Sequence, residues 1–349
     1  MRRESRLRTF QLTRDIYRVI GCLGVIRSAE VGFSIVDAER SRIPSLLALV
    51  GPTASGKTRV AMDLALEFGP LELVSIDSMT VYRSMDIGTA KPAEEDLKGI
   101  SYHLLGVVDP WEEYSVSQFQ IDVKAALDSI AGRHGLPLLV GGTGLYFQAV
   151  VDGLEIPGRW PEIRSELEKR ASTDAGLSDL YIQLQRLDPT AALKMEPNNV
   201  RRIVRALEVT LGSGKRFSDQ GPGLFRNTAK AVQVIGIDLP RAELFGRIEK
   251  RLDELLASGW VDEVRALLSS PFGLSRTARQ ALGYKEIISF LEGQVSMGEA
   301  RLAILARTKR LAKRQIAWFR RDPRIAWFSS PEGAKIELVS IVSGILGYP

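Results

Sequence analysis

The stretch LLALVGPTASGKT, residues 46–58, decides the fold that we expect for this chain. Its first five residues form a short apolar run that is typical of a buried strand, and apolar residues then recur at helical spacing from Lys57 to Phe68. The turn between them satisfies the pattern G-x-x-x-x-G-K-[ST] in the strand-to-helix setting that this pattern requires. A glycine turn without a ligand is the plain alternative, but the complete pattern between a strand and a helix favours a phosphate loop.

Each residue type in this loop has a physical role toward phosphate. Glycines let backbone N–H groups curl around phosphate oxygens, and the N-terminus of the following helix adds positive potential. Lys57 supplies a point charge, and the Thr58 hydroxyl is a ligand for Mg²⁺. The pattern leaves open whether a phosphoryl group is transferred or a diphosphate is held as a leaving group. The residues expected to hold the phosphates are Gly51, Thr53, Ala54, Ser55, Gly56, Lys57 and Thr58.

Further apolar runs predict more strands of the same sheet. Residues 73–76, 138–140 and 232–237 are short, apolar and bounded by turn or helix signals. Because helical patterns alternate with them, we predict an α/β fold: a parallel sheet like that of the P-loop NTPases, flanked by helices on both faces. From about residue 157 to 197 the strand signals vanish and charged helical patterns take over, which predicts an inserted helical domain.

These patterns divide the chain into parts. Arginines and a short apolar stretch near the start indicate either a targeting segment or an upstream extension, and the acids Glu4 and Asp15 favour the extension. The expected parts are an N-terminal extension at 1–43 with no predicted fold, a P-loop catalytic core at 44–156 and 198–330, the helical insertion at 157–197, and a C-terminal segment at 331–349.

Composition narrows the class of protein. The 349 residues are 45% hydrophobic and 26% charged, which is typical of a globular domain, and the net charge of +5 is a mild basic excess. Cys22 is the only cysteine, so the chain has no internal disulfide and too few thiol and imidazole groups for a zinc cage. No apolar run approaches the roughly 20 residues that cross a bilayer. We therefore expect a cytoplasmic protein outside the membrane.

Polar residues follow two of the predicted strands. Asp77 comes directly after residues 73–76, and Gly141-Gly142-Thr143 follows residues 138–140. The carboxyl ends of neighbouring parallel strands face the crevice in which such sheets bind ligands, so Asp77 and Thr143 are candidates for substrate contact. Both residue types are also ordinary helix N-caps, and spacing alone favours neither interpretation.

A basic tract near the C-terminus predicts a nucleic-acid surface. Residues 301–324 carry nine arginines and lysines against one acid, Asp322. On a helix these charges cover more than one face, which a solvated stripe does not require, and a phosphate backbone is their natural partner. A solvated face remains the plain alternative. A second basic cluster, at residues 201–205, is available to grip the same nucleic acid.

Seven motifs, taken in order along the chain, resemble those of the bacterial tRNA dimethylallyltransferases, which are also called tRNA isopentenyltransferases or IPP transferases. They are GPTASGKT at 51–58, DS-x-x-x-Y at 77–82, MDIGTAKP at 85–92, LLVGGTGLYF at 138–147, RRIVRALEV at 201–209, QALGYKE at 280–286 and LAKRQIAWFR at 311–320. Only the phosphate loop is distinctive by itself. The shared order over residues 46–328 makes the resemblance specific.

The resemblance implies an enzyme that transfers a dimethylallyl group from dimethylallyl diphosphate to the N6 amine of the adenosine 3′-adjacent to the anticodon in tRNA, with release of diphosphate. Asp77 is then the candidate general base, or an acceptor that only orients the amine, and Thr143 contacts the same amine. Arg247 is the candidate third catalytic residue because the family has an arginine on the diphosphate in this segment, and Arg251 is its rival.

The same resemblance implies the partners and the RNA contacts. The cofactor is Mg²⁺ on Thr58, the partners are a tRNA anticodon stem-loop and dimethylallyl diphosphate, the helical insertion contacts the tRNA, and the enzyme is expected to act as a monomer. The residues expected to contact tRNA are Asp77, Ser78, Met79, Thr80, Thr143, Arg201, Arg202, Arg205, Gln280, Gly283, Tyr284, Lys285, Lys313, Arg314 and Gln315.

Three other functions stay open at this point. An adenylate isopentenyltransferase shares the loop and the donor but has no need of two basic tracts. A P-loop kinase consumes ATP, whereas prenyl transfer consumes none. An RNA-binding protein with a vestigial loop is disfavoured by the intact Lys57 and Thr58.

Overall fold

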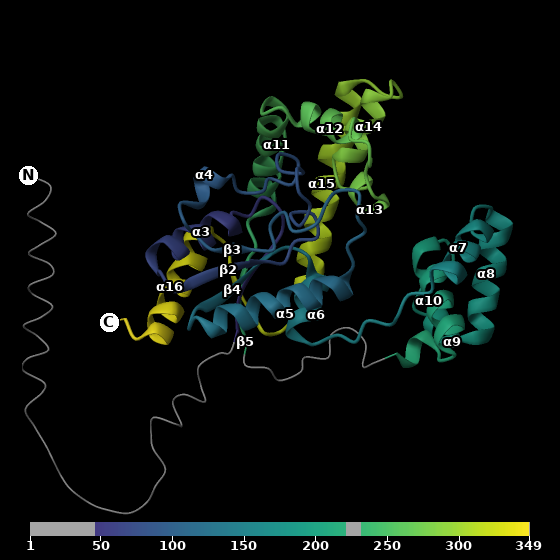
Figure 1. Ribbon diagram of the computed structural model, residues 1–349, viewed down its shortest axis with the longest axis horizontal. Helices are drawn as coiled ribbons and strands as arrows, with labels where there is room; N and C mark the ends of the chain where they lie inside the picture. The colour runs from purple at the N-terminus through teal and green to yellow at the C-terminus, as the bar shows by residue number, and fades with distance from the viewer. Residues whose placement is uncertain (1–45, 221–231, 349) are drawn as a thin grey trace, which may run out of the picture. The chain divides into compact units, whose positions relative to one another are not determined.

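The computed structural model describes residues 46–220 and 232–348, so the predicted N-terminal extension and Cys22 lie outside the described residues. Within the described ranges, six strands form one parallel sheet in the order β3-β2-β4-β1-β5-β6 (Figure 1). The predicted α/β fold is confirmed. The strands are β1 (Leu46–Val50), β2 (Leu71–Ser75), β3 (Tyr102–His103), β4 (Leu136–Gly141), β5 (Val232–Ile237) and β6 (Ile325–Phe328).

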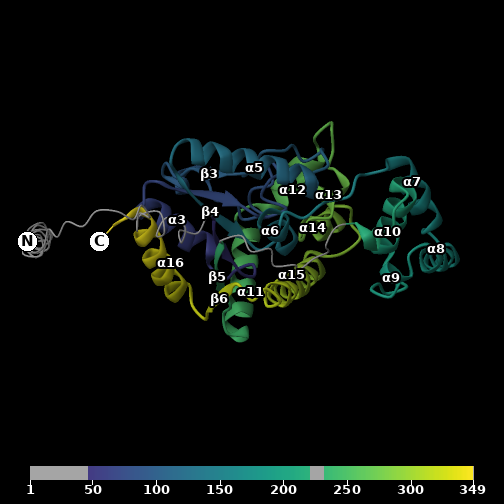
Figure 2. The same ribbon diagram turned by 90° about the horizontal axis from the view of Figure 1, so that it is seen from below.

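Helices cover both faces of this sheet. Helices α3 (Lys57–Glu67) and α16 (Pro331–Leu346) pack together on one face, and α5 (Val116–Gly132) covers the other face with α6 (Gly144–Val151) beside it (Figure 2). Strand β1 is buried from Leu47 onward because it has neighbours on both faces and both edges. Burial on both faces is why the strands read as continuous apolar runs.

The strand order brings three loops to one place. Strand β1 pairs with β4, and β4 pairs with β2, all in parallel. The loops that follow these three strands therefore leave the sheet at the same edge, side by side. One is the phosphate loop, one carries Asp77, and one is Gly141-Gly142-Thr143.

A group of helices packs beyond this edge. Helix α15 contacts α11, α14 and α6, and α12 contacts α11 and α14. The start of α15 is specified locally, because Ser296 and Glu299 cap each other's backbone N–H groups. The helices of this group are α11 (Arg241–Ala257), α12 (Trp260–Leu268), α13 (Arg276–Arg279), α14 (Tyr284–Leu291) and α15 (Met297–Phe319), and the short helix α4 (Glu94–Leu97) precedes β3 along the chain.

The helical insertion has its own hydrophobic core and is longer than predicted. Its elements are α7 (Pro161–Arg170), α8 (Asp174–Leu187), α9 (Pro189–Ala192), α10 (Val200–Ser213) and the 3-10 turn η1 (Phe217–Asp219). Leu167, Leu180 and Leu184 pack against Ile203 and Leu207 of α10. The predicted boundary at residue 197 is wrong because the apolar face of α10 completes this core. We call α7 to η1 the helical unit.

The predicted C-terminal boundary at residue 330 also needs correction. Ala334, Leu338 and Val342 recur every four residues on α16 and are buried in the core of the sheet domain. Strands β3 and β6 were not predicted, since strands of two and four residues carry little periodic signal. Helix α5 was also not predicted. Among residues 46–220 and 232–348, no helix is both long enough and apolar enough to cross a membrane.

Asp188 holds the end of the helical unit together. Its side chain is fully buried and accepts hydrogen bonds from Ala191 N–H at 2.9 Å, Ser218 N–H at 2.7 Å and Ser218 Oγ at 2.7 Å. Burial alone raises the pKa of this carboxyl, but the hydrogen bonds from Ser218 and Ala191 outweigh burial and hold the pKa below its usual range.

We predict that Asp188→Ala lowers the free energy of unfolding of the helical unit by roughly 3 kcal/mol, because it leaves buried donors without an acceptor. Urea denaturation followed by circular dichroism measures the loss. Since the folded-state pKa lies below the unfolded value, the contribution of Asp188 is present above pH 4 and is lost as pH falls through the folded pKa. The exposed residue Asp179 provides the control, and equal stability of Asp188→Ala and Asp179→Ala would contradict the assignment.

Candidate active site and nucleic-acid interface

The phosphate loop forms one wall of a cavity at the carboxyl edge of the sheet. Gly51 has φ +150°, and a Cβ there would lie 2.6 Å from the carbonyl oxygen of Ile237. Only glycine therefore fits at the point where the loop leaves the sheet. Gly56 has φ +92° and is the N-cap of α3. The cavity has a volume of about 340 Å³, and the loop residues Thr53–Thr58 line it while Gly51 lies behind them.

Lys57 lies at the bottom of this cavity with its charge poorly solvated. Its side chain is buried, and Nζ donates to the carbonyl oxygen of Pro52 at 2.6 Å and to Ser55 Oγ at 3.4 Å. Burial lowers the pKa of Lys57 to about 7, against the attraction of Asp77 and with some help from the repulsion of Arg251. A bound anion reverses this effect, because it restores a partner for the ammonium.

Asp77 and Thr143 lie on adjacent turns. The Asp77 carboxylate lines the 340 Å³ cavity, and its Oδ1 accepts from Met79 N–H at 2.8 Å. The next helix along the chain is α4 at Glu94, so Asp77 does not cap a helix. Thr143 is at the N-cap position of α6 but makes no side-chain cap bond; its Oγ1 accepts from Ser78 N–H at 3.2 Å. Thr143 therefore ties the turn after β4 to the Asp77 turn.

The structure separates the two candidate arginines of α11. Arg251 lines the cavity and is partly buried; burial lowers its pKa, while Asp77 and Glu254 oppose that shift. Arg247 lies outside the lining and pairs with Glu243 at 2.8 Å, although a Cβ on Gly56 would be 3.6 Å from its Nη1. Arg251 is therefore the arginine that faces Lys57 and Asp77, and Arg247 lies at the outer side of the loop.

Gln315 of α15 bridges the two glycine turns. Its Oε1 accepts from Thr53 N–H of the phosphate loop at 2.9 Å, and its Nε2 donates to the carbonyl oxygen of Gly142 at 2.9 Å. The fit is close, because a Cβ on Gly142 would lie 2.4 Å from Gln315 Nε2. One side chain thus sets the spacing between the phosphate loop and the turn that carries Thr143.

A second, smaller cavity of about 130 Å³ adjoins the first, and both are lined by Thr53, Asp77 and Arg251. Its far side is apolar, with side chains from α11, α12 and α15. The apolar lining residues are Ile248, Leu252, Leu255, Trp260, Leu282, Ile304 and Leu311.

Glu263 of α12 holds the loop that covers this smaller cavity. Its carboxylate accepts from the N–H groups of residues 86–88 at 2.7, 2.6 and 3.2 Å, and from the hydroxyl of Tyr284 at 2.7 Å. Gly88 must be glycine here, since a Cβ would lie 2.0 Å from Trp260 Nε1. The sequence analysis missed Glu263 because an isolated acid on an amphipathic helix carries no motif.

A third cavity, of about 1020 Å³, lies between the helical unit and the core. Ser78 and Met79 line it, and it shares Ala281, Leu282 and Leu311 with the apolar cavity. Its lining is strongly basic against two acids, Glu113 and Glu208. The basic lining residues are Arg159, Arg164, Arg201, Arg276, Lys285, Arg307, Arg310 and Arg314. We call it the basic cavity.

Comparison with known proteins agrees with this geometry. An IPP transferase family model matches residues 80–322, and an isopentenyl transferase model matches residues 44–106. The tRNA dimethylallyltransferase of Desulforudis audaxviator is 42% identical over 305 residues, which cover 86% of this chain and 98% of that protein. The tRNA dimethylallyltransferase of Streptomyces coelicolor is 41% identical over 306 residues, 88% of this chain and 97% of that protein.

The chain belongs to the IPP transferase family. The crystal structure of the Bacillus halodurans tRNA isopentenylpyrophosphate transferase aligns with a TM-score of 0.62 and 35% identity, covering 86% of this chain and 96% of that one. A eukaryotic dimethylallyltransferase described as acting on tRNA aligns with a TM-score of 0.69 and 25% identity, covering 87% and 80%. The fold and the family predicted from the motifs are confirmed.

Three consecutive residues of the family motif KRQ point in three directions on α15. Successive residues of an α-helix are about 100° apart around its axis. Lys313 lies over the ring of Phe245 on α11, with Nζ 5.6 Å from the ring centroid, and Arg314 lines the basic cavity. Gln315 makes the bridge described above. Of these three predicted tRNA contacts, only Arg314 faces the basic cavity.

The rest of the basic tract is also divided. Arg307, Arg310 and Arg314 share the face toward the basic cavity. Arg301 pairs with Asp253 at 2.7 Å, and Arg324 with Asp152 at 2.7 Å, so both hold helices to the core. The sequence pattern predicted the basic tract. It did not predict which of its residues face the basic cavity, because that depends on how α15 packs against the other helices.

The motif QALGYKE splits in the same way. Gln280 and Lys285 line the basic cavity. Tyr284 is fully buried, donates to Glu263 and stands edge-to-face to Trp260, so its predicted contact with RNA is wrong for this conformation. Gly283 has φ +89°, and a Cβ there would lie 2.0 Å from the Trp260 ring. These two residues build the wall that Glu263 supports.

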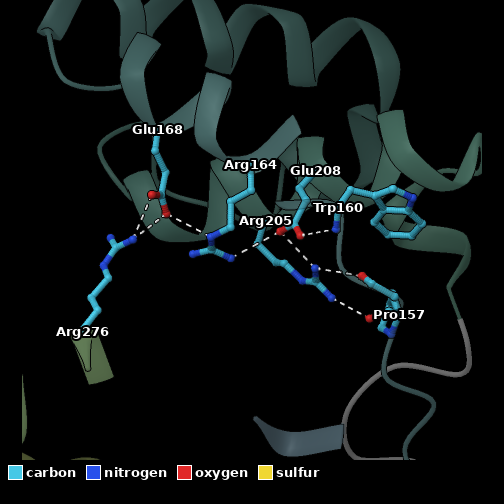
Figure 3. A network of polar contacts seen from close by, with 8 residues as sticks. Pro157, Trp160, Arg164, Glu168, Arg205, Glu208 and Arg276 are labelled. Carbon is cyan, nitrogen blue, oxygen red and sulfur yellow. Dashed lines mark hydrogen bonds and ion pairs between the residues drawn. The ribbon is translucent and has the colours of Figure 1, made fainter. Parts of the chain in front are cut away.

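The arginines of α10 have different tasks as well. Arg201 is exposed, lines the basic cavity and hydrogen-bonds to Gln280 of the core. Arg202 is exposed and does not line the cavity. Arg205 donates to the carbonyl oxygens of Pro157 and Gly158 at 2.8 and 3.1 Å and pairs with buried Glu208 at 3.0 Å (Figure 3). Arg205 therefore fastens the chain that leads into the helical unit.

Thr80 and the loop after β2 complete the placement of the predicted residues. Thr80 Oγ1 lies 2.9 Å from Ser75 Oγ and lines the 340 Å³ cavity rather than the basic one. Ser78 and Met79 lie on the other side of the Asp77 turn, in the basic cavity. Arg159, Arg164 and Arg276 carry no motif, and the sequence analysis missed them.

We predict that inorganic diphosphate binds with proton uptake at pH 8, because Lys57 is largely neutral in the free site and charged in the complex. Calorimetry in two buffers of different ionisation enthalpy measures the uptake. Diphosphate itself ionises in this pH range, so the affinity of the wild type is divided by that of Lys57→Met at each pH. This ratio is expected to fall about tenfold per pH unit above pH 7. Lys124→Met on α5 is the exposed control; the same proton uptake in Lys57→Met as in wild type would rule out this role for Lys57.

We predict that Gln315→Leu weakens inorganic diphosphate binding about tenfold, because it releases the phosphate loop from the Gly142 turn and leaves two polar backbone groups without a partner. Direct calorimetric titration measures the change. Lys313→Leu, two residues away on α15, is the matched control and should bind as the wild type does. A Gln315→Leu variant with unchanged affinity would show that the bridge does not position the loop.

Proposed function

We propose that this protein transfers a dimethylallyl group from dimethylallyl diphosphate to the N6 amine of the adenosine 3′-adjacent to the anticodon in tRNA, releasing diphosphate. The chain is a prenyltransferase of the tRNA-modifying IPP transferase family. One observation carries the finer proposal: the Asp77 turn lies where the phosphate-loop cavity, the apolar cavity and the basic cavity meet.

The two smaller cavities match the two ends of the prenyl donor. The diphosphate has the loop N–H groups, Lys57 and Arg251 as partners in the 340 Å³ cavity. The branched five-carbon chain then has the adjoining apolar cavity, which removes it from water as the hydrophobic effect favours. Because the cavities meet at Asp77, the carbon that reacts is held beside this carboxylate.

The basic cavity matches the RNA. Arg307, Arg310 and Arg314 on one face of α15 oppose Arg201 of the helical unit across it, which places cations on both sides of a bound RNA backbone. The target base must be unstacked to reach Asp77, and a single-stranded loop makes unstacking least costly. An anticodon loop therefore suits this site better than a duplex.

The reaction joins the two halves at Asp77. The adenine amine attacks the allylic carbon, the bond from carbon to the diphosphate oxygen breaks, and its electron pair leaves with the diphosphate. Lys57, Arg251 and the loop N–H groups stabilise the charge that develops there, as preorganised donors do. Asp77 uses Oδ1 for Met79 N–H, and its second oxygen accepts the amine hydrogen, either taking the proton or orienting the lone pair.

The residues of the cavity also fit Mg²⁺. Thr58 supplies a hard hydroxyl oxygen on this lining, and Mg²⁺ in phosphate sites takes few protein ligands and keeps several waters. When bound through Thr58, the ion neutralises charge on the leaving diphosphate. We further propose that the enzyme acts in the cytoplasm and as a monomer, as the resemblance to the tRNA dimethylallyltransferases implies.

We predict that labelled dimethylallyl diphosphate transfers its label to unmodified tRNA and not to free AMP or ATP, and that Asp77→Ala lowers this rate by about 10²–10⁴-fold. Asp77→Asn keeps an acceptor for Met79 N–H, so a large loss in Asp77→Asn as well assigns proton removal, whereas near-normal turnover assigns orientation only. Asp128→Asn on α5 is the exposed control. Label in free AMP, or phosphate release from ATP without prenyl transfer, would overturn the proposal.

A further inference from the structure

One ion pair crosses the basic cavity from the helical unit to the core. Glu168 of α7 accepts from Arg276 Nη1 of α13 with both carboxylate oxygens, at 2.8 and 2.9 Å, and from Arg164 Nε at 3.0 Å (Figure 3). Both arginines line the basic cavity. Burial raises the pKa of Glu168, but Arg276 and Arg164 outweigh burial and hold the pKa below its usual range, so the group is anionic at neutral pH.

The site around Arg164 is built rather than accidental. Glu208 has no solvent exposure; its carboxylate accepts hydrogen bonds from Trp160 N–H at 3.0 Å and Arg164 Nη1 at 3.3 Å, and it forms an ion pair with Arg205 Nη1 at 3.0 Å. The Arg164 guanidinium is therefore held on one side by Glu208 and presents its Nε to Glu168 (Figure 3). A fixed guanidinium loses little freedom when it binds an anion.

The partner of these two arginines is exchangeable. Arg276 and Arg164 have side chains 56% and 38% exposed, and Glu168 is 31% exposed, so an incoming ligand reaches them. A phosphate, although tetrahedral, also presents two anionic oxygens on one atom, and arginine binds carboxylates and phosphates through the same pairs of N–H donors. Exposed ion pairs of this kind contribute only about 0–1 kcal/mol, so a polyanion can displace one.

We propose that Arg276 and Arg164 form a subsite for a phosphate of the RNA backbone, and that Glu168 occupies this subsite until RNA enters. The inference rests on the proposed RNA substrate and deepens it. Glu168 is thus an internal competitor: a side chain of the enzyme that competes with RNA for Arg276 and Arg164. While the basic cavity holds no RNA, Glu168 links the helical unit to the core.

Removing the Glu168 carboxylate tests whether Glu168 competes with RNA or only links the helical unit to the core. Glu168→Gln is expected to bind unmodified tRNA about threefold to fivefold more tightly at low salt, because RNA no longer has to displace an anion. The gain should shrink as ionic strength rises, since exposed charges are screened over about 8 Å at physiological salt. Arg276→Gln should weaken binding, and Glu168→Gln added to Arg276→Gln should give a clearly smaller gain, because Glu168 then competes for Arg164 alone.

Filter binding or fluorescence anisotropy with the full-length enzyme measures these affinities. Glu166→Gln is the matched control: it is exposed on the same helix, removes the same charge, and should change tRNA affinity little. Weaker binding by Glu168→Gln, or an equal gain with and without Arg276, would overturn the competitor role. Wild-type tRNA binding and label transfer, measured alongside, test the proposed function separately, so a wild type that binds and transfers while Glu168→Gln shows no gain contradicts this inference alone.

Discussion

The parallel pairing of β4 between β1 and β2 is the constraint on which the rest of the site depends. Parallel neighbours end at the same edge, so this pairing sets the phosphate loop, the Asp77 turn and the Gly142 turn side by side. Side chains of different loops therefore interact directly. The Asp77 carboxylate attracts the Lys57 ammonium, and Thr143 Oγ1 accepts a hydrogen bond from Ser78 N–H. The strand order therefore sets which three loops form the site.

Helix α15 connects this edge of the sheet to the basic cavity. Because neighbouring residues on a helix diverge by about 100°, one basic segment serves three surfaces. Lys313 packs over Phe245, Arg314 faces the basic cavity, and Gln315 clamps the phosphate loop to the Gly142 turn. The same helix thus lines the basic cavity and sets the spacing of the two glycine turns.

The sequence predicted the fold, the family and the phosphate loop, since each has a local signature: an apolar run, a glycine pattern, a helical period. It did not predict which cations face the basic cavity, because that depends on long-range packing of α13, α15 and the helical unit. Arg276 carries no motif, and Tyr284 lies in a motif but is buried against Trp260. Arg247 and Arg251 lie one turn apart on α11, and which of them lines the cavity likewise depends on how α11 packs against α15 and α12.

In the proposed complex, RNA meets one face of the basic tract, the face toward the helical unit. Lysine modification followed by mass spectrometry, with and without unmodified tRNA, tests it directly, because Lys285 lines the basic cavity while Lys313, also exposed, lies over Phe245. We expect tRNA to protect Lys285 and to leave Lys313 as reactive as Lys124 on α5. Protection of Lys313 with Lys285 unprotected would contradict it.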